Sequence, residues 1–322
     1  GLALGWMALN LWQQVGGPGF AGTALLHKAD PTSSRGALWR QCARLIAEQP
    51  WLGVGWGQFN FAWTLTPMPG LPRTAGYSFT HAHNLLVQWA VELGLPLTLV
   101  LLALLVFALW RTARALRNPA SPQPLVRSAA FTMVLIVLLH SLLEFPLWHT
   151  HFLLPTCFLF GLALTPTAAS LRGNRTEWQP TVAPLLMALA AASTLLDYRS
   201  VAAVYLPPPD AAPLAQRIAQ AQRSPLFGYL GGRFACTLAP SGQRSLVACQ
   251  QAAFEMLDPR LLTSWALALH EGGQEQQARF VAARLREFET PLAQRFFAIC
   301  ASQPQAFQCL PATTNFGFRD FR

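Results

Sequence analysis

The run from Leu85 to Trp110 contains a single charged residue, Glu92, and it exceeds the about 20 apolar residues that a membrane-spanning helix needs. Three further apolar runs follow, at 126–143, 147–164 and 182–196, of which the last is short. Only 11% of the chain is charged and 52% is hydrophobic, whereas soluble domains carry about 25% charged residues. The sequence therefore predicts an all-α fold built on polytopic membrane helices.

Arginine placement predicts how these helices are oriented. The first connection contains Arg111, Arg114, Arg117 and Arg127, the third contains Arg172 and Arg175, and the second, 144–151, contains no Lys or Arg. Because short loops rich in Lys and Arg stay in the cytoplasm, we expect the first and third connections there. The second connection, the loop of about 13–84 and everything after Tyr198 then lie outside, in a bacterial periplasm.

The chain divides into two predicted domains. Residues 1–198 form a membrane domain that includes the large periplasmic loop, and 199–322 form a periplasmic helical domain that follows the linker Pro207–Asp210. Because the chain starts at Gly1 inside an apolar run, Leu2–Trp12, we expect it to be the C-terminal part of a longer membrane protein.

The periplasmic domain is predicted to consist of amphipathic helices. Glycines 272 and 273 join two of them into a helix–turn–helix of the size of a tetratricopeptide unit, and a plain helical hairpin is the alternative. The predicted helices are Leu214–Arg223, Ser245–Leu257, Leu261–His270, Glu275–Phe288 and Leu292–Ala301.

Four of the six cysteines, Cys236, Cys249, Cys300 and Cys309, fall in this domain, where an oxidising periplasm allows disulfides. Four cysteines permit three pairings. We favour the two local pairs, Cys236 with Cys249 and Cys300 with Cys309.

The outer loop is rich in arginine although it faces away from the cytoplasm, and arginine forks suit phosphates. Thr32–Ser34 offers N-caps for a helix that ends before Pro50. On it Arg40 and Arg44 share one face, with Leu38, Cys42 and Leu45 on another. The net charge of +9 comes without a basic run or aromatic platform, so nucleic acid is not an expected partner.

Two histidines, His81 and His83, stand at the start of the first long apolar run. A histidine has a pKa of about 6.5 and can act as a general base near neutral pH, or it can simply cap a helix. Glycines 53, 55 and 57 could let backbone approach a ligand, or they could serve an ordinary turn.

A zinc site is a further alternative, because His81 and His83 and the pair His149 and His151 all fall on the outer side. Both pairs stand where helices begin, and no cysteine or carboxylate pattern completes the set. We therefore predict no metal and no cofactor.

The order of these motifs resembles the O-antigen ligase and polymerase superfamily. An arginine-rich helix precedes Pro-Trp-Leu-Gly-x-Gly-x-Gly-x-Phe at 50–59 and His-Asn-Leu-Leu-x-Gln-x-x-x-Glu-Leu-Gly at 83–94. His-Ser-Leu-Leu-Glu-Phe-Pro-Leu at 140–147 resembles the branch of bacterial protein O-oligosaccharyltransferases, which glycosylate pilins.

The resemblance implies roles for individual residues. The family's histidine matches His83, not His81, and would activate the acceptor hydroxyl. We add His81 and Asn84 as candidate substrate-binding residues. Arg35, with Arg40 or Arg44, would bind the diphosphate of an undecaprenyl-linked glycan. Glu144 matches the acid of the later motif, whose role the sequence does not reveal, and the family works without a metal.

The predicted function is transfer of a glycan from undecaprenyl diphosphate to a Ser or Thr hydroxyl of a pilin-like protein, without a metal and with inversion, at the periplasmic face of the inner membrane. The first alternative is an O-antigen ligase or polymerase that acts on lipid A core or another glycan. The second is a non-catalytic membrane scaffold whose helical tail binds partners.

Overall fold

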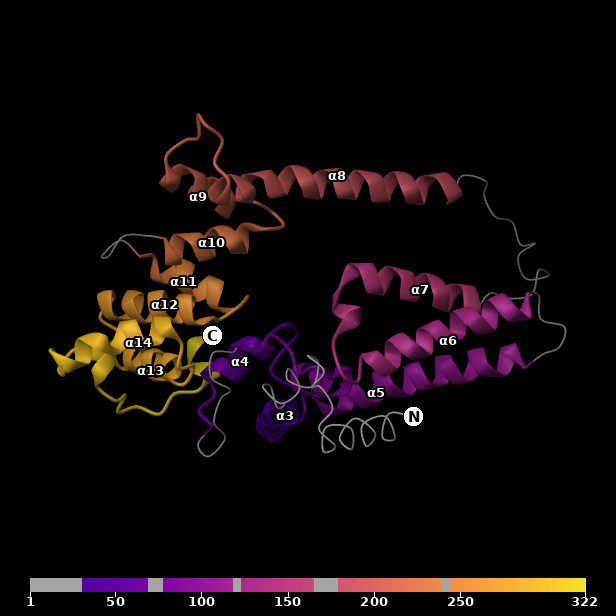
Figure 1. The fold of residues 1–322 in the computed structure, drawn as a ribbon, viewed down its shortest axis with the longest axis horizontal. Helices are drawn as coiled ribbons and strands as arrows, with labels where there is room; N and C mark the ends of the chain where they lie inside the picture. The colour runs from indigo at the N-terminus through magenta and orange to yellow at the C-terminus, as the bar shows by residue number, and fades with distance from the viewer. Residues whose placement is uncertain (1–30, 69–77, 118–122, 165–178, 239–243) are drawn as a thin grey trace, which may run out of the picture.

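The computed structural model describes residues 31–68, 78–117, 123–164, 179–238 and 244–322, and this part of the chain contains helices, turns and loops without a strand (Figure 1). The all-α prediction is confirmed for these residues; the apolar run Leu2–Trp12 lies outside them. The α-helices, labelled as in Figure 1, are α3 (Pro31–Glu48), α4 (Phe59–Leu65), α5 (Leu85–Leu116), α6 (Pro124–His140), α7 (Thr150–Leu164), α8 (Gln179–Tyr205), α9 (Leu214–Gln222), α10 (Gly228–Thr237), α11 (Leu246–Ala253), α12 (Pro259–Glu271), α13 (Glu275–Arg286) and α14 (Pro291–Phe297). The short 3₁₀ helices are η1 (Pro146–Trp148), η3 (Ala298–Ala301), η4 (Phe307–Cys309) and η5 (Phe318–Phe321).

The helix α3 is amphipathic in the predicted sense. Its buried side carries Leu38, Cys42 and Leu45, whereas Arg40 is exposed and Arg44 is half-exposed. The predicted N-cap at 32–34 is wrong, because the helix begins at Pro31 and these residues lie in its first turn. Proline suits the first helical position, since its fixed φ is helical and the amide hydrogen that it lacks has no partner there.

The four apolar runs form α5, α6, α7 and α8, and α5, α6 and α7 pack side by side (Figure 1). In the described part, α5 and the Pro184–Tyr205 stretch of α8 are long and apolar enough to cross a membrane, and α6 and α7 are apolar but shorter. The helix α6 ends at His140, earlier than predicted, and α7 starts at Thr150, because residues 141–143 turn and η1 carries the chain between them.

The arginines that predict orientation gather at one end of this group of helices. Arg111 and Arg114 stand near the end of α5, Arg117 directly follows it, and Arg127 lies in the first turn of α6. Arg172 and Arg175 lie outside the described residues. The cytoplasmic placement of this end remains a prediction.

The C-terminal helices pack on one another in chain order, from α8 on α9 to α12 on α13. The predicted hairpin is present: α12 and α13 are joined at Gly272 and Gly273, and Gly273 adopts a φ of 76°. The tetratricopeptide assignment stays a prediction. Residue 198, the predicted domain boundary, lies inside α8, which continues to Tyr205.

The helix α10 was not predicted, because its segment contains glycines at 228, 231 and 232, and glycine weakens isolated helices. In the fold the missing side chain is what allows packing: a Cβ on Gly231 would stand 2.3 Å from the backbone nitrogen of Gln222 in α9. Tertiary contact therefore outweighs propensity here.

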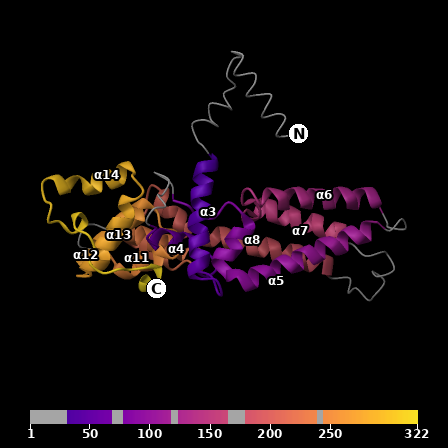
Figure 2. The ribbon, with the colours of Figure 1, turned by 90° about the horizontal axis from the view of Figure 1, so that it is seen from below.

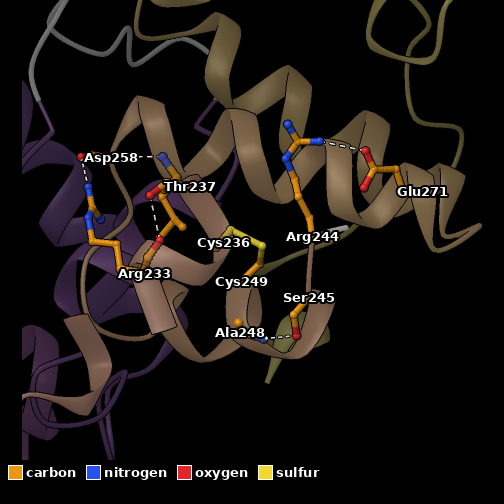
Figure 3. The surroundings of a disulfide bond; sticks show 10 residues. Arg233, Cys236, Thr237, Arg244, Ser245, Ala248, Cys249, Asp258 and Glu271 are labelled. Atoms are coloured by element: carbon orange, nitrogen blue, oxygen red, sulfur yellow. Dashed lines mark hydrogen bonds and ion pairs between the residues drawn. A yellow bond between two sulfur atoms is a disulfide. The ribbon is translucent and has the colours of Figure 1, made fainter. Parts of the chain in front are cut away.

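Both favoured disulfides are present, Cys236–Cys249 and Cys300–Cys309. Figure 3 shows the first of them joining α10 to α11, with the ion pairs Arg233–Asp258 and Arg244–Glu271 around it. Both sulfur-bearing side chains of this pair are fully buried. The disulfide thus links consecutive helices inside the C-terminal core.

Replacing Cys236 and Cys249 together by serine should lower the stability of the C-terminal helices by about 2–4 kcal/mol, because the bond closes a loop with a sequence separation of 13 residues. Thermal unfolding of the purified protein, compared under oxidising and reducing conditions, measures the change. Cys157→Ser, at an exposed free cysteine, is the control and should leave the midpoint unchanged.

One hydrophobic core unites the segment before α5 with the C-terminal helices. Phe61 of α4 stacks on Phe254 with ring centroids 4.7 Å apart, and Trp63 meets Phe288 at 6.0 Å. Figure 2 shows α3 standing between the helices α12–α14 and the group α5–α7. Gln58 donates a hydrogen bond to the carbonyl of Phe254, 196 positions later in the chain. The segment before α5 is therefore held in place by residues of the C-terminal helices.

Candidate functional site

A cavity of about 540 Å³ lies where the start of α5 meets the connection between α6 and α7. Its wall is mostly apolar and aromatic, and a few polar side chains converge on it, which is the usual make-up of a ligand site. The lining residues are Trp56, His81, His83, Asn84, Leu85, Gln88, Trp89, Ser141, Glu144, Phe145, Leu147, Trp148 and Leu153.

The structure brings His83 and Glu144 together at this cavity. The Nδ1 atom of His83 lies 2.7 Å from Oε2 of Glu144, although the two residues are 61 positions apart. Their side chains retain exposed fractions of 24% and 34%. An ionised carboxylate accepts the Nδ1 proton and orients the ring, so that Nε2 is the atom available to exchange a proton.

His83 has a φ of 51°, in the left-handed region that few residues other than glycine adopt. Such backbone conformations persist where the surrounding structure enforces them, and they gather at functional sites. The enforcing contacts come from the next residue, Asn84.

Asn84 is the N-cap of α5, and its Oδ1 accepts hydrogen bonds from the amides of Leu86 and Val87. Its Nδ2 donates to the carbonyl of Leu142 at 2.8 Å, and the amide of Leu85 donates to Ser141 at 2.8 Å. Both ends of the Asn84 side chain are thus engaged by backbone. Asn84 thus ties the His83 segment to the turn that carries Glu144, and its predicted role in substrate binding stays a prediction.

His81 lies beside His83, with ring centroids 4.7 Å apart, and its Nδ1 shares a hydrogen bond of 2.6 Å with Thr80. Its Nε2 is buried and has no hydrogen-bond partner among the described residues. Burial, and next the neighbouring His83, lower the pKa of His81 from 6.5 to about 4. A neutral imidazole therefore presents an unsatisfied nitrogen at the cavity, which can bind a hydroxyl or an amide of a ligand.

Acidification from about pH 6.5 to pH 4 should destabilise the fold through His81. In this window the unfolded chain binds a proton at His81 that the folded chain does not, so stability is present above pH 6.5 and is lost toward pH 4. Thermal midpoints of the parent and His81→Gln across this range measure the effect. The variant should lose less stability than the parent, and an exposed control, His151→Gln, should match the parent; equal losses in all three would contradict the assignment.

The glycine-rich turn packs backbone to backbone against a break in α5. Gly94 has φ 77° and ψ 168° inside that helix, and a Cβ there would stand 2.4 Å from the carbonyl oxygen of Trp51. A Cβ on Gly53 would stand 2.4 Å from the backbone of Glu92. The glycines were predicted either to let backbone approach a ligand or to serve a turn. At Gly53 the close approach is made to the backbone of α5 and not to a ligand. We call this contact between the motifs at 50–59 and 92–94 the joint.

Hydrogen bonds lock this joint. The amides of Val54 and Gly55 donate to the carbonyls of Val91 and Glu92 at 2.8 and 2.9 Å. Oε1 of Glu92 accepts from the amide of Phe59 at 3.1 Å. Glu92, the charged residue inside the first apolar run, thus helps to hold the glycine-rich turn against α5.

Trp56 lies in the glycine-rich turn and lines the cavity. Its ring stacks on that of Trp148, with ring centroids 6.0 Å apart. Neither these tryptophans nor Gln88 were predicted as site residues. Oε1 of Gln88 accepts a hydrogen bond from the amide of Ala82 at 2.7 Å. Their membership of the two quoted motifs and of the 140–148 segment was the only available signal.

Of the three candidate arginines, Arg40 and Arg44 do not line the cavity. Arg40 is exposed, and Arg44 forms an ion pair with Glu48 at 3.0 Å. The side chain of Arg35 lies outside the described part. The helix that carries them does reach the site, because Nε1 of Trp39 donates to the carbonyl of Ala82, between the two histidines, at 2.9 Å.

The zinc alternative finds no support in the described residues, in which no three His, Cys, Asp or Glu side chains are placed to share an ion. The rings of His149 and His151 stack on each other at 5.3 Å. The Nδ1 atom of His83 faces Glu144. A metal-free site remains the prediction.

The C-terminal helices hold the segment that leads to the histidines. Oδ1 of Asn60, in α4, accepts from the amide of Leu257 at 2.6 Å, and its Nδ2 donates to the carbonyl of Phe79 at 2.8 Å. Ser78 donates to the carbonyl of Leu257 at 2.7 Å. The buried Asn60 amide therefore links the helical tail to the approach of His81.

Comparison with known proteins identifies two family regions. Residues 128–295 match the family described as virulence factor membrane-bound polymerase, C-terminal, and residues 2–102 match the O-antigen ligase family. No solved structure matches the chain.

Two curated proteins of Acinetobacter baylyi are similar to it. A general O-oligosaccharyltransferase is 32% identical over 146 residues, which are 45% of this chain and 24% of that protein. A ComP-specific O-oligosaccharyltransferase is 30% identical over 133 residues, which are 41% and 23% of the two chains. The match thus spans about a quarter of the length of either relative. With its match to the membrane-bound polymerase family over 128–295, more than half of its length, the chain belongs to the O-antigen ligase superfamily, on the side of its O-oligosaccharyltransferases.

Proposed function

We propose that this chain carries the reaction centre of a glycosyltransferase that moves a glycan from undecaprenyl diphosphate to a hydroxyl in the periplasm. The observation that carries the proposal is the His83–Glu144 pair at 2.7 Å on the wall of a largely apolar cavity. A base oriented by a carboxylate is the arrangement that activates a weakly acidic alcohol.

In the proposed reaction, Nε2 of His83 takes the proton of the acceptor hydroxyl while its oxygen attacks the anomeric carbon. The bond from that carbon to the diphosphate breaks, and undecaprenyl diphosphate leaves with the electron pair. A single displacement inverts the anomeric centre and needs neither a metal nor a covalent enzyme intermediate. Glu144 orients the ring and stabilises the imidazolium that forms.

Positive side chains would stabilise the negative charge on the departing diphosphate, and we propose that Arg35 binds it. Helical spacing puts position 35 one turn before Trp39, on the face of α3 that reaches Ala82. Arg40 and Arg44 are secondary candidates, since Arg44 is already paired with Glu48. A guanidinium fork can bind a phosphate with two parallel hydrogen bonds.

A protein acceptor is the favoured one, because both similar curated proteins are named O-oligosaccharyltransferases. Lipid A core or a growing glycan, as for an O-antigen ligase or polymerase, is the alternative that the O-antigen ligase match supports. The proposed setting is the bacterial inner membrane, with the cavity and the C-terminal helices on the periplasmic side.

The test is a transfer assay with purified protein in lipid vesicles, a lipid-linked glycan as donor, and either a pilin-like protein or a lipid A core as acceptor. Glycosylated pilin as the product supports the proposal, and transfer to lipid A core alone assigns the ligase function. Absence of transfer from the donor to any acceptor, with partner binding to the tail retained, would favour the non-catalytic scaffold.

A further inference from the structure

The tip of the glycine-rich turn is exposed, apolar and uncharged. Trp51, Leu52 and Trp56 have exposed fractions of 75%, 86% and 65%. No ionisable residue lies between Pro50 and Gly57. Large apolar side chains clustered on a surface mark contact with a partner or with a membrane.

The position of the tip along α5 distinguishes these two. The amide of Leu95 donates to the carbonyl of Pro50 at 2.8 Å, so the tip is fixed at the break in the helix. Before the break, Gln88, Ala90, Val91 and Glu92 are buried in protein. After it, Leu95, Leu97 and Leu99 are exposed, with fractions of 43%, 46% and 63%.

The length of the exposed part matches a bilayer. From Leu95 to Arg114 the helix rises about 29 Å at 1.5 Å per residue, close to the about 30 Å of the hydrocarbon core. At the far end Trp110 is exposed, and the guanidinium of Arg114 lies 5.5 Å from its ring centroid. Tryptophans mark both interfaces of membrane proteins, and Trp51 holds the equivalent place at the near end.

We propose that the turn Trp51–Trp56 lies in the outer interface of the bilayer, with Trp51 and Leu52 inserted among the lipids, and that the membrane begins at Gly94. The segment Leu85–Leu93 then stands outside the hydrocarbon core. The polar side chains of Gln88 and Glu92 then do not face lipid, although the sequence predicts a membrane span that starts at Leu85.

The placement has a consequence for the cavity. Trp56 belongs to the inserted turn and also lines the cavity, where it stacks on Trp148, itself 47% exposed. The cavity mouth then lies at the level of the lipid headgroups. A diphosphate carried on a membrane-embedded prenyl chain reaches this level without leaving the bilayer. The insertion itself does not depend on the proposed glycosyl transfer.

Depth-dependent fluorescence quenching tests the proposal. The protein, in a Cys157→Ser background, carries a small thiol-reactive fluorophore at Leu52→Cys and is reconstituted in vesicles of phosphatidylcholine and phosphatidylglycerol. The vesicles contain lipids with a nitroxide either near the headgroup or deep in the acyl chain. Leu104→Cys, 59% exposed on α5, and Val247→Cys, 62% exposed on α11, are the matched positions.

We expect emission at position 52 to fall most with the shallow nitroxide, at 104 with the deep one, and at 247 with neither. Quenching at 104 without quenching at 52 overturns the insertion while α5 remains in the membrane. A signal at 52 that responds to an added acceptor protein, and not to nitroxide lipid, overturns it in favour of a protein-docking surface. No quenching at 104 would show that the membrane span, and the insertion with it, is wrong.

Discussion

His83→Gln should lower the rate of glycan transfer by about 10²–10⁴-fold, the contribution that a positioned general base typically makes. Glutamine keeps hydrogen-bonding capacity at the turn before α5 but cannot take a proton at neutral pH. The fold should survive, because the helix is capped by Asn84 and not by His83. The measurement is the initial rate of transfer from a lipid-linked glycan at matched protein concentration.

Two neighbouring substitutions serve as controls. His81→Gln removes the second cavity imidazole and should act mainly on binding, raising KM more than it lowers kcat. Glu144→Gln keeps the shape of the carboxylate that faces Nδ1 at 2.7 Å, and it should lower kcat while leaving donor binding intact. Parent-like rates for His83→Gln, or a loss in His81→Gln alone, would show that the base is a different residue.

Gly94→Ala should strongly destabilise the fold, because it combines backbone strain with crowding. Its backbone angles belong to a region that is nearly exclusive to glycine, where strain costs about 1–3 kcal/mol. The new Cβ would also stand 2.4 Å from the Trp51 carbonyl, which forces the glycine-rich turn off α5. We expect a markedly lower thermal midpoint together with loss of transfer, because Trp56 leaves the cavity with the turn.

Two glycines separate strain from crowding in this experiment. Gly57 has a φ of 71° but no atom within 4 Å of an added Cβ, so Gly57→Ala should show left-handed strain alone, about 1–2 kcal/mol. Gly36 lies inside α3, and a Cβ there would also have no atom within 4 Å. Gly36→Ala should therefore stabilise the fold by about 0.5–1 kcal/mol. If Gly94→Ala cost no more than Gly57→Ala, the close packing of turn and helix would be refuted.

The apolar helices and the C-terminal hairpin follow from local patterns. Long uncharged runs demand helix in a bilayer, and the buried positions of α3 repeat with helical spacing at Leu38, Cys42 and Leu45. Helix ends were less accurate: α6 stops at His140 because the chain turns at 141–143 to bring Glu144 to the site. The turn depends on contacts with α5, which no local window contains.

The sequence names candidate site residues, and the structure shows how they are arranged. Motif order and resemblance singled out His83, Asn84 and Glu144, yet a sequence states no distance between residues 61 positions apart. The structure pairs His83 with Glu144 and shows the Asn84 side chain hydrogen-bonded to backbone at both ends. It also leaves Arg40 and Arg44 off the cavity wall, since their face of α3 points to solvent.

The sequence by itself determined the all-helical class and the apolar segments, because both depend on residue type and short-range spacing. It favoured the local disulfides among three possible pairings, and it named His83 as the candidate base. Tertiary structure alone decided that α4 shares a core with the C-terminal helices, through contacts such as Phe61 with Phe254. It alone decided that two glycine motifs form one joint, because the fit between the Gly53 and Gly94 backbones exists only once both segments are folded. Local sequence patterns do not say which segments pack together. Long-range packing decides this, and in this chain it forms the cavity.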